Sequence, residues 1–210
     1  CLQELPNGNR IVGNCHAGDK NPQIFEITHD KKVVWEYESA KENGNAGKRV
    51  DVHAFARLPD GSTMIAESGV GRFIHVDKDG KKLKEVPMGD GGRKKTRLVR
   101  LLDNGHYLAC AEHPGVVTEY DKEGKVVWEY ETKTRVYGAI RLKNGNTLIA
   151  TGSGNSVVEV SPDKKVVWEI TKKVPDTEIG LAWTTCLQEL PNGNRIVGNC
   201  HAGDKNPQIF

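Results

Sequence analysis

The sequence predicts an all-β protein: one β-propeller domain over residues 1–210, built from four-stranded antiparallel blades. The first observation is a turn of the form Leu-x-Asn/Asp-Gly that recurs every 40 to 53 residues, a spacing typical of propeller blades. Its glycines are Gly8, Gly61, Gly105, Gly145 and Gly193. The second observation is that short runs of β-forming residues flank each turn without a 3.6-residue period, which excludes helical repeats.

Each repeat contains four of these short runs, in the same order. The first precedes the turn (53–58 and 137–142), the second follows it (64–67 and 107–111), and the third and fourth form a hairpin (116–120 with 125–130, and 156–160 with 165–170). Asn-Gly and Asp-Gly suit the positive φ angles of hairpin turns, which explains why the turn is the most regular feature.

The fourth run carries a tryptophan at one equivalent position, at Trp35, Trp128 and Trp168. We expect this side chain to fill the space between adjacent outer strands. Replacing Trp128 by Ala is then expected to cost roughly 3–5 kcal/mol, as for a buried aromatic residue.

The run count gives five blades, the last of which lacks its outer strand. Their boundaries are residues 1–37, 50–87, 95–131, 135–171 and 183–210. In the alternative, the outer strand at 32–37 completes the blade begun by 183–210 and closes a four-bladed, interlocked ring over 26–210. Residues 1–25 are then a surplus copy. We favour five blades.

Residues 1–25 recur without a change as residues 186–210, whereas the internal repeats have diverged. So long a match indicates either a very recent duplication or, as we favour, a chain that has been engineered or recombined. Either copy fits the same place in a blade, so a strand-exchanged homo-oligomer is the alternative to the monomer that we favour.

Composition excludes several classes of protein. With 30 Lys and Arg against 28 Asp and Glu, the net charge of +2 gives no general attraction to nucleic acid. The apolar runs are too short for a membrane span, and the first residues lack the features of a signal peptide, so a soluble protein without membrane or nucleic-acid partners is expected. Five cysteines without a CxxC pair suggest neither a zinc knuckle nor a disulfide framework, and they leave the compartment open.

Several units, LPNGNRIVGN (5–14), DKEGKVVWEYE (121–131) and the repeat at 141–170, carry a family likeness over nearly the whole chain. They resemble the repeats of bacterial propellers of the pyrroloquinoline-quinone-like and arylsulfotransferase-like type, which are often secreted or periplasmic. The quinone enzymes resembled here use a longer ring and calcium. No acidic calcium cluster and no counterpart of the arylsulfotransferase histidine is found in this sequence, so we expect no pyrroloquinoline quinone. The resemblance is specific for the fold and not for an activity, since such propellers include both enzymes and scaffolds. Because the sequence shows no catalytic constellation, we expect a non-catalytic scaffold or binding module.

The candidate site lies at the channel mouth, the end of the ring where the first strands begin. The long loops 39–49, 88–96 and 172–183 all lead into a first strand, and loops on a rigid scaffold carry binding. Alignment on the turn glycine places a different residue at the mouth in each blade, which is compatible with a tailored pocket and also with solvent-lined positions that tolerate any polar residue. The predicted ligand-binding residues are His53, Arg97, Tyr137 and Thr185 at that position, Trp183 nearby, and Glu67, Glu112 and His113 in the loops after the second strands.

Basic residues gather on the same face and predict a small anionic or carbohydrate ligand. They are Lys48, Arg49, Arg93, Lys94, Lys95, Arg97, Lys133, Arg135, Lys172 and Lys173. A hydrolytic propeller is the alternative, with Asp51, Glu67 and Glu112 as carboxylates that meet at the mouth.

A divalent metal is a further alternative at this face, because thiolate, imidazole and carboxylate groups are competent ligands. The residues are Cys15, His16, His113, Cys200 and His201. Their spacing forms no local metal motif, so no cofactor is the preferred prediction.

Overall fold

The computed structural model confirms the all-β fold class, and none of the residues it describes forms a helix. It describes residues 1–15, 17, 21–89, 96–204 and 206–210. The strands of the first two sheets are β1 (Leu2–Glu4), β2 (Arg10–Gly13), β3 (Ile24–Ile27), β4 (Val33–Tyr37), β5 (Val52–Arg57), β6 (Thr63–Glu67), β7 (Arg72–Val76) and β8 (Lys82–Pro87). Those of the other three are β9 (Thr96–Leu101), β10 (Tyr107–Ala111), β11 (Val116–Tyr120), β12 (Val126–Glu131), β13 (Gly138–Arg141), β14 (Thr147–Ala150), β15 (Ser156–Val160), β16 (Val166–Thr171), β17 (Thr184–Glu189) and β18 (Arg195–Asn199).

Four sheets are complete four-stranded antiparallel meanders, in the orders β1-β2-β3-β4, β5-β6-β7-β8, β9-β10-β11-β12 and β13-β14-β15-β16. The fifth sheet pairs β17 with β18, and an isolated bridge from Gly198 to Ile209 stands where a third strand begins. Within the described residues, the last blade therefore has two full strands and the start of a third. β4 pairs with β3 of the same blade, so the interlocked four-bladed closure is not the arrangement adopted.

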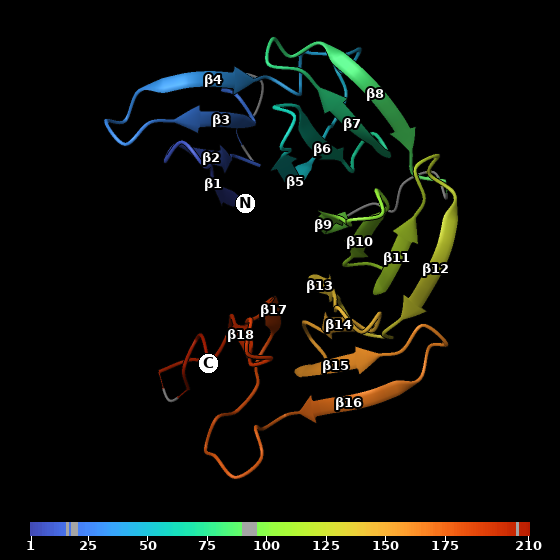
Figure 1. Ribbon diagram of the computed structural model, residues 1–210. Helices are drawn as coiled ribbons and strands as arrows, with labels where there is room; N and C mark the ends of the chain where they lie inside the picture. Colours follow the sequence, from blue (N-terminus) through green and yellow to red (C-terminus); the bar gives the residue numbers. More distant parts are fainter. Residues whose placement is uncertain (16, 18–20, 90–95, 205) are drawn as a thin grey trace.

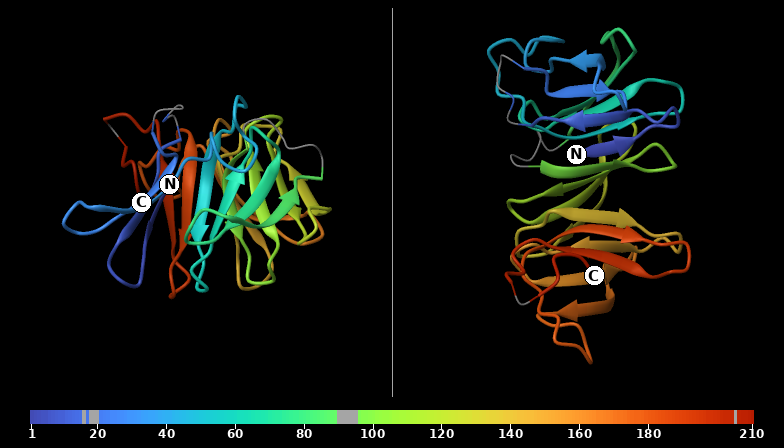
Figure 2. Two further views of the ribbon diagram at one scale, coloured as in Figure 1. Left: turned by 90° about the horizontal axis from the view of Figure 1, so that it is seen from above. Right: turned by 90° about the vertical axis from the view of Figure 1, so that its left-hand side faces the viewer.

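The five sheets follow one another around an arc, with their first strands on the inside (Figure 1). The first and last sheets lie on either side of the opening of this arc. Figure 2 shows the inner strands running between two faces that bear loops. We call these faces the mouth, where β5, β9, β13 and β17 begin, and the turn end, where the Asn-Gly and Asp-Gly turns lie.

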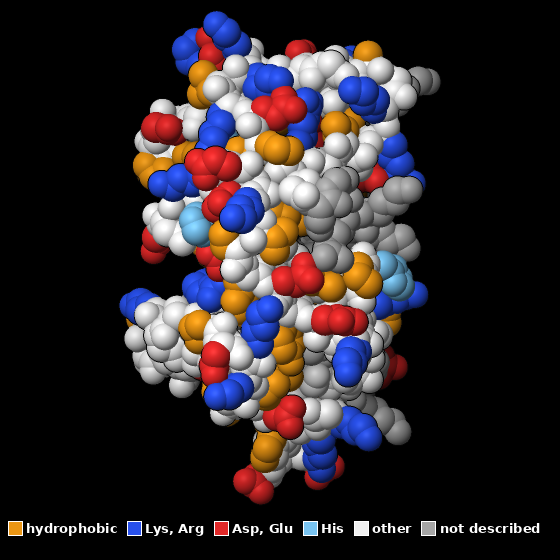
Figure 3. Space-filling model, turned by 90° about the vertical axis from the view of Figure 1, so that its right-hand side faces the viewer, with side chains coloured by type: hydrophobic (Ala, Val, Ile, Leu, Met, Phe, Trp, Pro, Cys, Tyr) orange, Lys and Arg blue, Asp and Glu red, His pale blue; other side chains and the backbone are white. Residues whose placement is uncertain are grey.

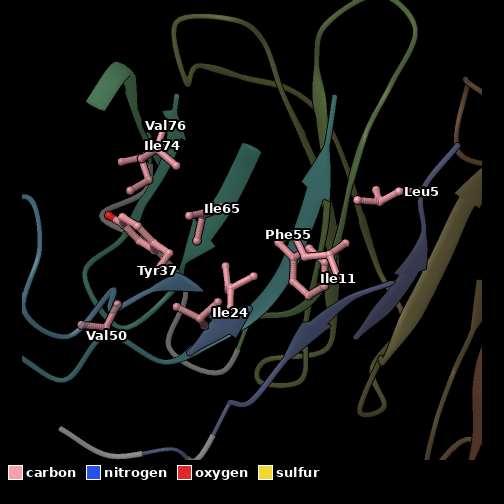
Figure 4. Packing of buried hydrophobic residues seen from close by; sticks show 10 residues of the cluster. Leu5, Ile11, Ile24, Tyr37, Val50, Phe55, Ile65, Ile74 and Val76 are labelled. Carbon is pink, nitrogen blue, oxygen red and sulfur yellow. The ribbon is translucent and has the colours of Figure 1, made fainter. Parts of the chain in front are cut away.

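The core is divided into clusters between adjacent sheets. Figure 4 shows the first of them, in which Ile11 and Ile24 of the first sheet face Phe55, Ile65 and Ile74 of the second. Because each of the three middle sheets (β5–β8, β9–β12 and β13–β16) lies between two neighbours, the hydrophobic stabilisation is shared along the arc.

A clamp of three side chains joins adjacent blades at three of the four junctions. In each clamp an arginine of one blade lies over a tryptophan ring of the preceding blade, at 4.4 to 5.2 Å, and pairs with a glutamate beside it. The members are Trp35, Glu26 and Arg57; Trp128, Glu119 and Arg141; Trp168, Glu159 and Arg195. The tryptophans are only partly buried, so the prediction that they behave as buried aromatic residues between the outer strands is corrected.

The junction between the second and third sheets is built differently. His75 and Lys84 occupy the paired positions that glutamate and tryptophan hold in the other blades. His75 Nε2 lies 2.8 Å from the hydroxyl of Tyr107, whose ring stacks on Phe73 with centroids 4.3 Å apart. Burial raises the pKa of Tyr107 to about 12, so its hydroxyl stays protonated at neutral pH.

This junction should make stability depend on pH. Burial, with a contribution from Lys84 and against one from Asp60, lowers the pKa of His75 below its usual range. The unfolded chain therefore binds more protons, and the stabilisation is complete above about pH 6.5 and lost as the pH falls through the folded-state pKa. The melting temperature of the protein should fall more steeply with acid than that of His75→Gln; equal pH profiles would contradict this.

Candidate functional site

The mouth holds a cluster built around the buried carboxylate of Glu112, which follows β10. Arg97 of β9 donates from Nε to Oε2 of Glu112 at 2.8 Å, and Arg135 Nη1 lies 3.5 Å from Oε1. One carboxylate thus orients two guanidinium groups from adjacent blades. The Arg135 side chain is 46 % exposed, so much of its hydrogen-bonding capacity faces solvent.

Tyr137 adds an aromatic wall to the cluster. Burial, followed by a hydrogen bond to the Glu112 carboxylate, raises the pKa of the Tyr137 hydroxyl. The hydroxyl is therefore a donor at neutral pH. The guanidinium of Arg97 lies 5.8 Å from the centroid of the Tyr137 ring.

A thiol and an imidazole extend the cluster toward the first blade. Cys15 Sγ lies 3.0 Å from Nδ1 of His53, and Nε2 of His53 lies 3.4 Å from Nη1 of Arg97. Burial raises the pKa of the Cys15 thiol, which favours the thiol form over the thiolate.

Trp183 forms the other side of the mouth in a backbone conformation that is rare for an aromatic residue, with φ at 59°. Its N–H donates to Asn155 Oδ1 at 2.8 Å, and its carbonyl accepts from the Cys200 N–H at 3.1 Å. These bonds hold a conformation that would otherwise relax. The ring lies 5.7 Å from that of Tyr137, and the Arg135 guanidinium lies 5.6 Å from the Trp183 centroid.

The cluster forms between blades because two rows of the repeat meet there. One row consists of the residues seven positions after a turn glycine. Each of them approaches a residue of the following blade that stands eight positions before its own turn glycine. Cys15 meets His53 in this way, and Glu112 meets Tyr137. The ring geometry therefore assembles the site from single residues of successive repeats.

The structure places the other predicted ligand-binding residues elsewhere. Glu67 is fully buried and accepts hydrogen bonds from Asn45 Nδ2 at 2.9 Å and from Arg72 Nε at 2.7 Å. Thr185 is partly buried at the start of β17, with its carbonyl against the backbone of Gly138. His113 is exposed in the loop between β10 and β11.

The predicted metal ligands are only partly described. Cys15 contacts His53, whereas Cys200 is exposed and the His201 ring lies 5.0 Å from that of Trp183. His16, like Arg93, Lys94 and Lys95 of the predicted basic rim, lies outside the described residues. In the part of the chain that the structure describes, no group of three His, Cys, Asp or Glu side chains could hold a metal ion.

A hollow of about 930 Å³ lies at the turn end of the inner strands, away from the mouth. β9, β13 and β17 line it, with Arg100, Glu119 and Glu189 among its charged residues. Burial lowers the pKa of Arg100, whose Nη2 lies 3.5 Å from the carbonyl of Leu187. Its lining holds as many acidic side chains (Asp103, Glu119 and Glu189) as basic ones (Arg100, Arg141 and Lys143), so it has no surplus positive charge to attract an anion.

On the side of the molecule drawn in Figure 3, the coloured Lys and Arg side chains are interspersed with Asp and Glu. No helix in the described ranges is long and apolar enough to cross a membrane.

The sequence identified His53, Arg97, Tyr137, Trp183 and Glu112 as site residues, and the structure brings these five together. It assigned Arg135 only to the general basic rim, and Cys15 only to a metal site. A signal for Arg135 existed, because it and Trp183 both stand ten residues before a turn glycine.

Comparison with known proteins shows the fold. A protein of unknown function from Bacteroides caccae has a TM-score of 0.77 at 19 % identity, over 99 % of this chain and 75 % of that one. A catalytically inactive virginiamycin B lyase from Staphylococcus aureus with quinupristin gives 0.69 at 14 %, over 100 % and 68 %. The WD40 β-propeller domain of Doa1 gives 0.68 at 18 %, over 96 % and 60 %.

At identities this low the likeness shows the β-propeller architecture alone. The chain spans only about three-fifths to three-quarters of the length of these three proteins. No protein-family model and no curated protein sequence matches the chain.

Proposed function

We propose that the protein is a non-catalytic binding module whose mouth cluster takes a small anionic carbohydrate, such as a sugar carboxylate. The observation that carries the proposal is the pair of guanidinium groups on the single buried carboxylate of Glu112, beside the ring of Trp183. The propeller fold supplies the rigid support for these side chains.

The charge of the cluster favours an anion. Arg97 and Arg135 carry two positive charges, and Glu112 carries one negative charge, so the three together have a surplus positive charge. Guanidinium groups bind carboxylates and sulfates through paired N–H donors. The Glu112 carboxylate lies beneath them and orients them, so less conformational entropy is lost on binding.

The aromatic side chains supply the apolar part of the site. Tyr137 and Trp183 lie side by side at an interplanar angle of 54°, and aromatic rings at a binding site can pack against the C–H face of a sugar. The pinned backbone of Trp183 fixes one of these rings in advance.

Hydrolysis has less support. Two carboxylates must act on the substrate in most glycoside hydrolases. Guanidinium groups engage both oxygens of Glu112, and Glu67 is enclosed in a network with Arg72 and Asn45. Neither group is presented as a free acid or base.

Titration calorimetry with D-glucuronate, and with D-glucose as the neutral control, tests the proposal. We expect glucuronate to bind and glucose to bind at least tenfold more weakly. Arg135→Gln and Trp183→Ala should each weaken glucuronate binding about tenfold, a loss of about 1.4 kcal/mol.

Lys165→Gln is the matched control, because it removes an exposed positive charge at a turn between β15 and β16, and it should leave the affinity unchanged. Equal binding of both sugars, or equal loss in all three variants, would contradict the proposal.

A further inference from the structure

The exact repeat provides an internal comparison, since one sequence occurs in two environments. We call residues 1–25 the N-segment and residues 186–210 the C-segment. Leu2 is 70 % exposed in the N-segment, whereas its counterpart Leu187 is 5 % exposed in the C-segment. The C-segment buries this face against Leu148 and Val157 of the fourth sheet.

The face that packs toward the following sheet is buried in the N-segment and exposed in the C-segment. Ile24 of the N-segment is fully buried against the second sheet, whereas its counterpart Ile209 is 69 % exposed. Ile11 is likewise fully buried, and its counterpart Ile196 only partly. Each segment is thus covered on one face, and the sequence is suited to being covered on both.

The structure also shows which strand belongs on the uncovered edge. In the first sheet, Glu26 and Ile27 pair with Ile11 and Arg10, and Tyr37 of β4 pairs with Ile24. The C-segment presents the same side chains at Arg195, Ile196 and Ile209. Residues 26–37 therefore match the C-segment as well as they match the N-segment.

We propose that two copies of the chain close one ring by exchange: residues 26–37 of each chain pair with the C-segment of the other, and both N-segments are released. Each chain contributes its three complete sheets (β5–β8, β9–β12 and β13–β16), and two shared blades join them. The ring then has eight blades.

The exchange changes the burial of the two segments and the freedom of the chain. Two segments covered on one face each are replaced by one segment covered on both, so the buried apolar area is nearly conserved. The released N-segment regains the conformational entropy of about 25 residues. The opening of the arc in Figure 1 is closed, and the exposed strand edges are paired.

The exchange keeps the mouth intact. Cys200 is the counterpart of Cys15, which contacts His53 of the following blade. In the closed ring, Cys200 takes that place beside the partner's His53. Glu112, Arg97 and Arg135 lie outside the exchanged segments and keep their contacts, so this inference does not depend on the proposed ligand.

Native mass spectrometry, together with light scattering over a range of concentrations, tests the exchange. We expect a dimer of twice 23.2 kDa that dissociates on dilution. A monomer up to millimolar concentration would overturn the proposal, whether its ring is open or closed on itself.

The repeat offers a matched pair of variants, the same substitution in the same local sequence. Ile209→Asn should weaken the dimer at least tenfold, because Ile209 becomes buried in the shared blade. Ile24→Asn should leave the dimer intact, because it lies in the released N-segment. The exchange would be overturned if Ile24→Asn weakened the dimer as much as or more than Ile209→Asn. It would also be overturned if Ile24→Asn failed to fold.

Discussion

Replacing Arg72 by Met should lower the free energy of unfolding by about 3–5 kcal/mol, because it leaves the Glu67 carboxylate buried without its countercharge. Arg72 Nε donates to Glu67 at 2.7 Å, and Nη2 donates to the Asn43 carbonyl and to Asn45 Oδ1, each at 3.0 Å. The substitution thus also removes two hydrogen bonds to the loop that follows β4. Urea denaturation of the two proteins measures the difference.

Two further variants show that burial causes the effect. Arg49→Met removes an ion pair to Asp51 in which the arginine is 84 % exposed, and it should leave stability nearly unchanged. Arg72→Met with Glu67→Leu should recover part of the loss, because no charge is then left buried alone. A loss below about 1 kcal/mol in the single Arg72 variant would contradict the account.

Replacing Trp128 by Ala should destabilise the protein by about 2–4 kcal/mol. The indole Nε1 donates to the Pro162 carbonyl of the next blade at 3.0 Å, and the Arg141 guanidinium lies 5.2 Å from the ring centroid. This expected loss of stability is smaller than the roughly 3–5 kcal/mol predicted from the sequence, because the Trp128 ring is only partly buried.

Trp168→Ala is the matched control, because it makes the same change in the clamp between the last two sheets. Trp168 is 39 % exposed and lies beside the incomplete last sheet, so its loss should be about half as large. Equal losses at both positions, measured by urea denaturation, would mean that the clamp does not depend on a complete following blade.

Much of the fold could be predicted because each repeat contains short sequence patterns that determine its turns and strands. The turn glycines, such as Gly61 at φ 86° and Gly145 at φ 87°, need a conformation that few other residues adopt, so their spacing reveals the blade length. The partial burial of Trp128 could not be predicted in this way, because it depends on how far adjacent blades diverge at the rim.

The candidate site was predictable only in part, for a reason of strand geometry. Glu67 is the last residue of β6, whereas Glu112 stands one position further on, just beyond the end of β10. Successive side chains point to opposite sides of a strand, so this single step puts Glu67 in the interior and Glu112 at the mouth. The positive φ of Trp183 could not be predicted from the local sequence, because hydrogen bonds to the distant residues Asn155 and Cys200 hold this conformation.

Binding of a small anion at the mouth cluster can be observed in a crystal of the protein soaked with D-glucuronate. We expect the carboxylate within hydrogen-bonding distance of Arg97 or Arg135 and the sugar ring against Trp183. Glucuronate bound instead in the hollow at the turn end, or absent from the mouth at saturating concentration, would contradict this expectation.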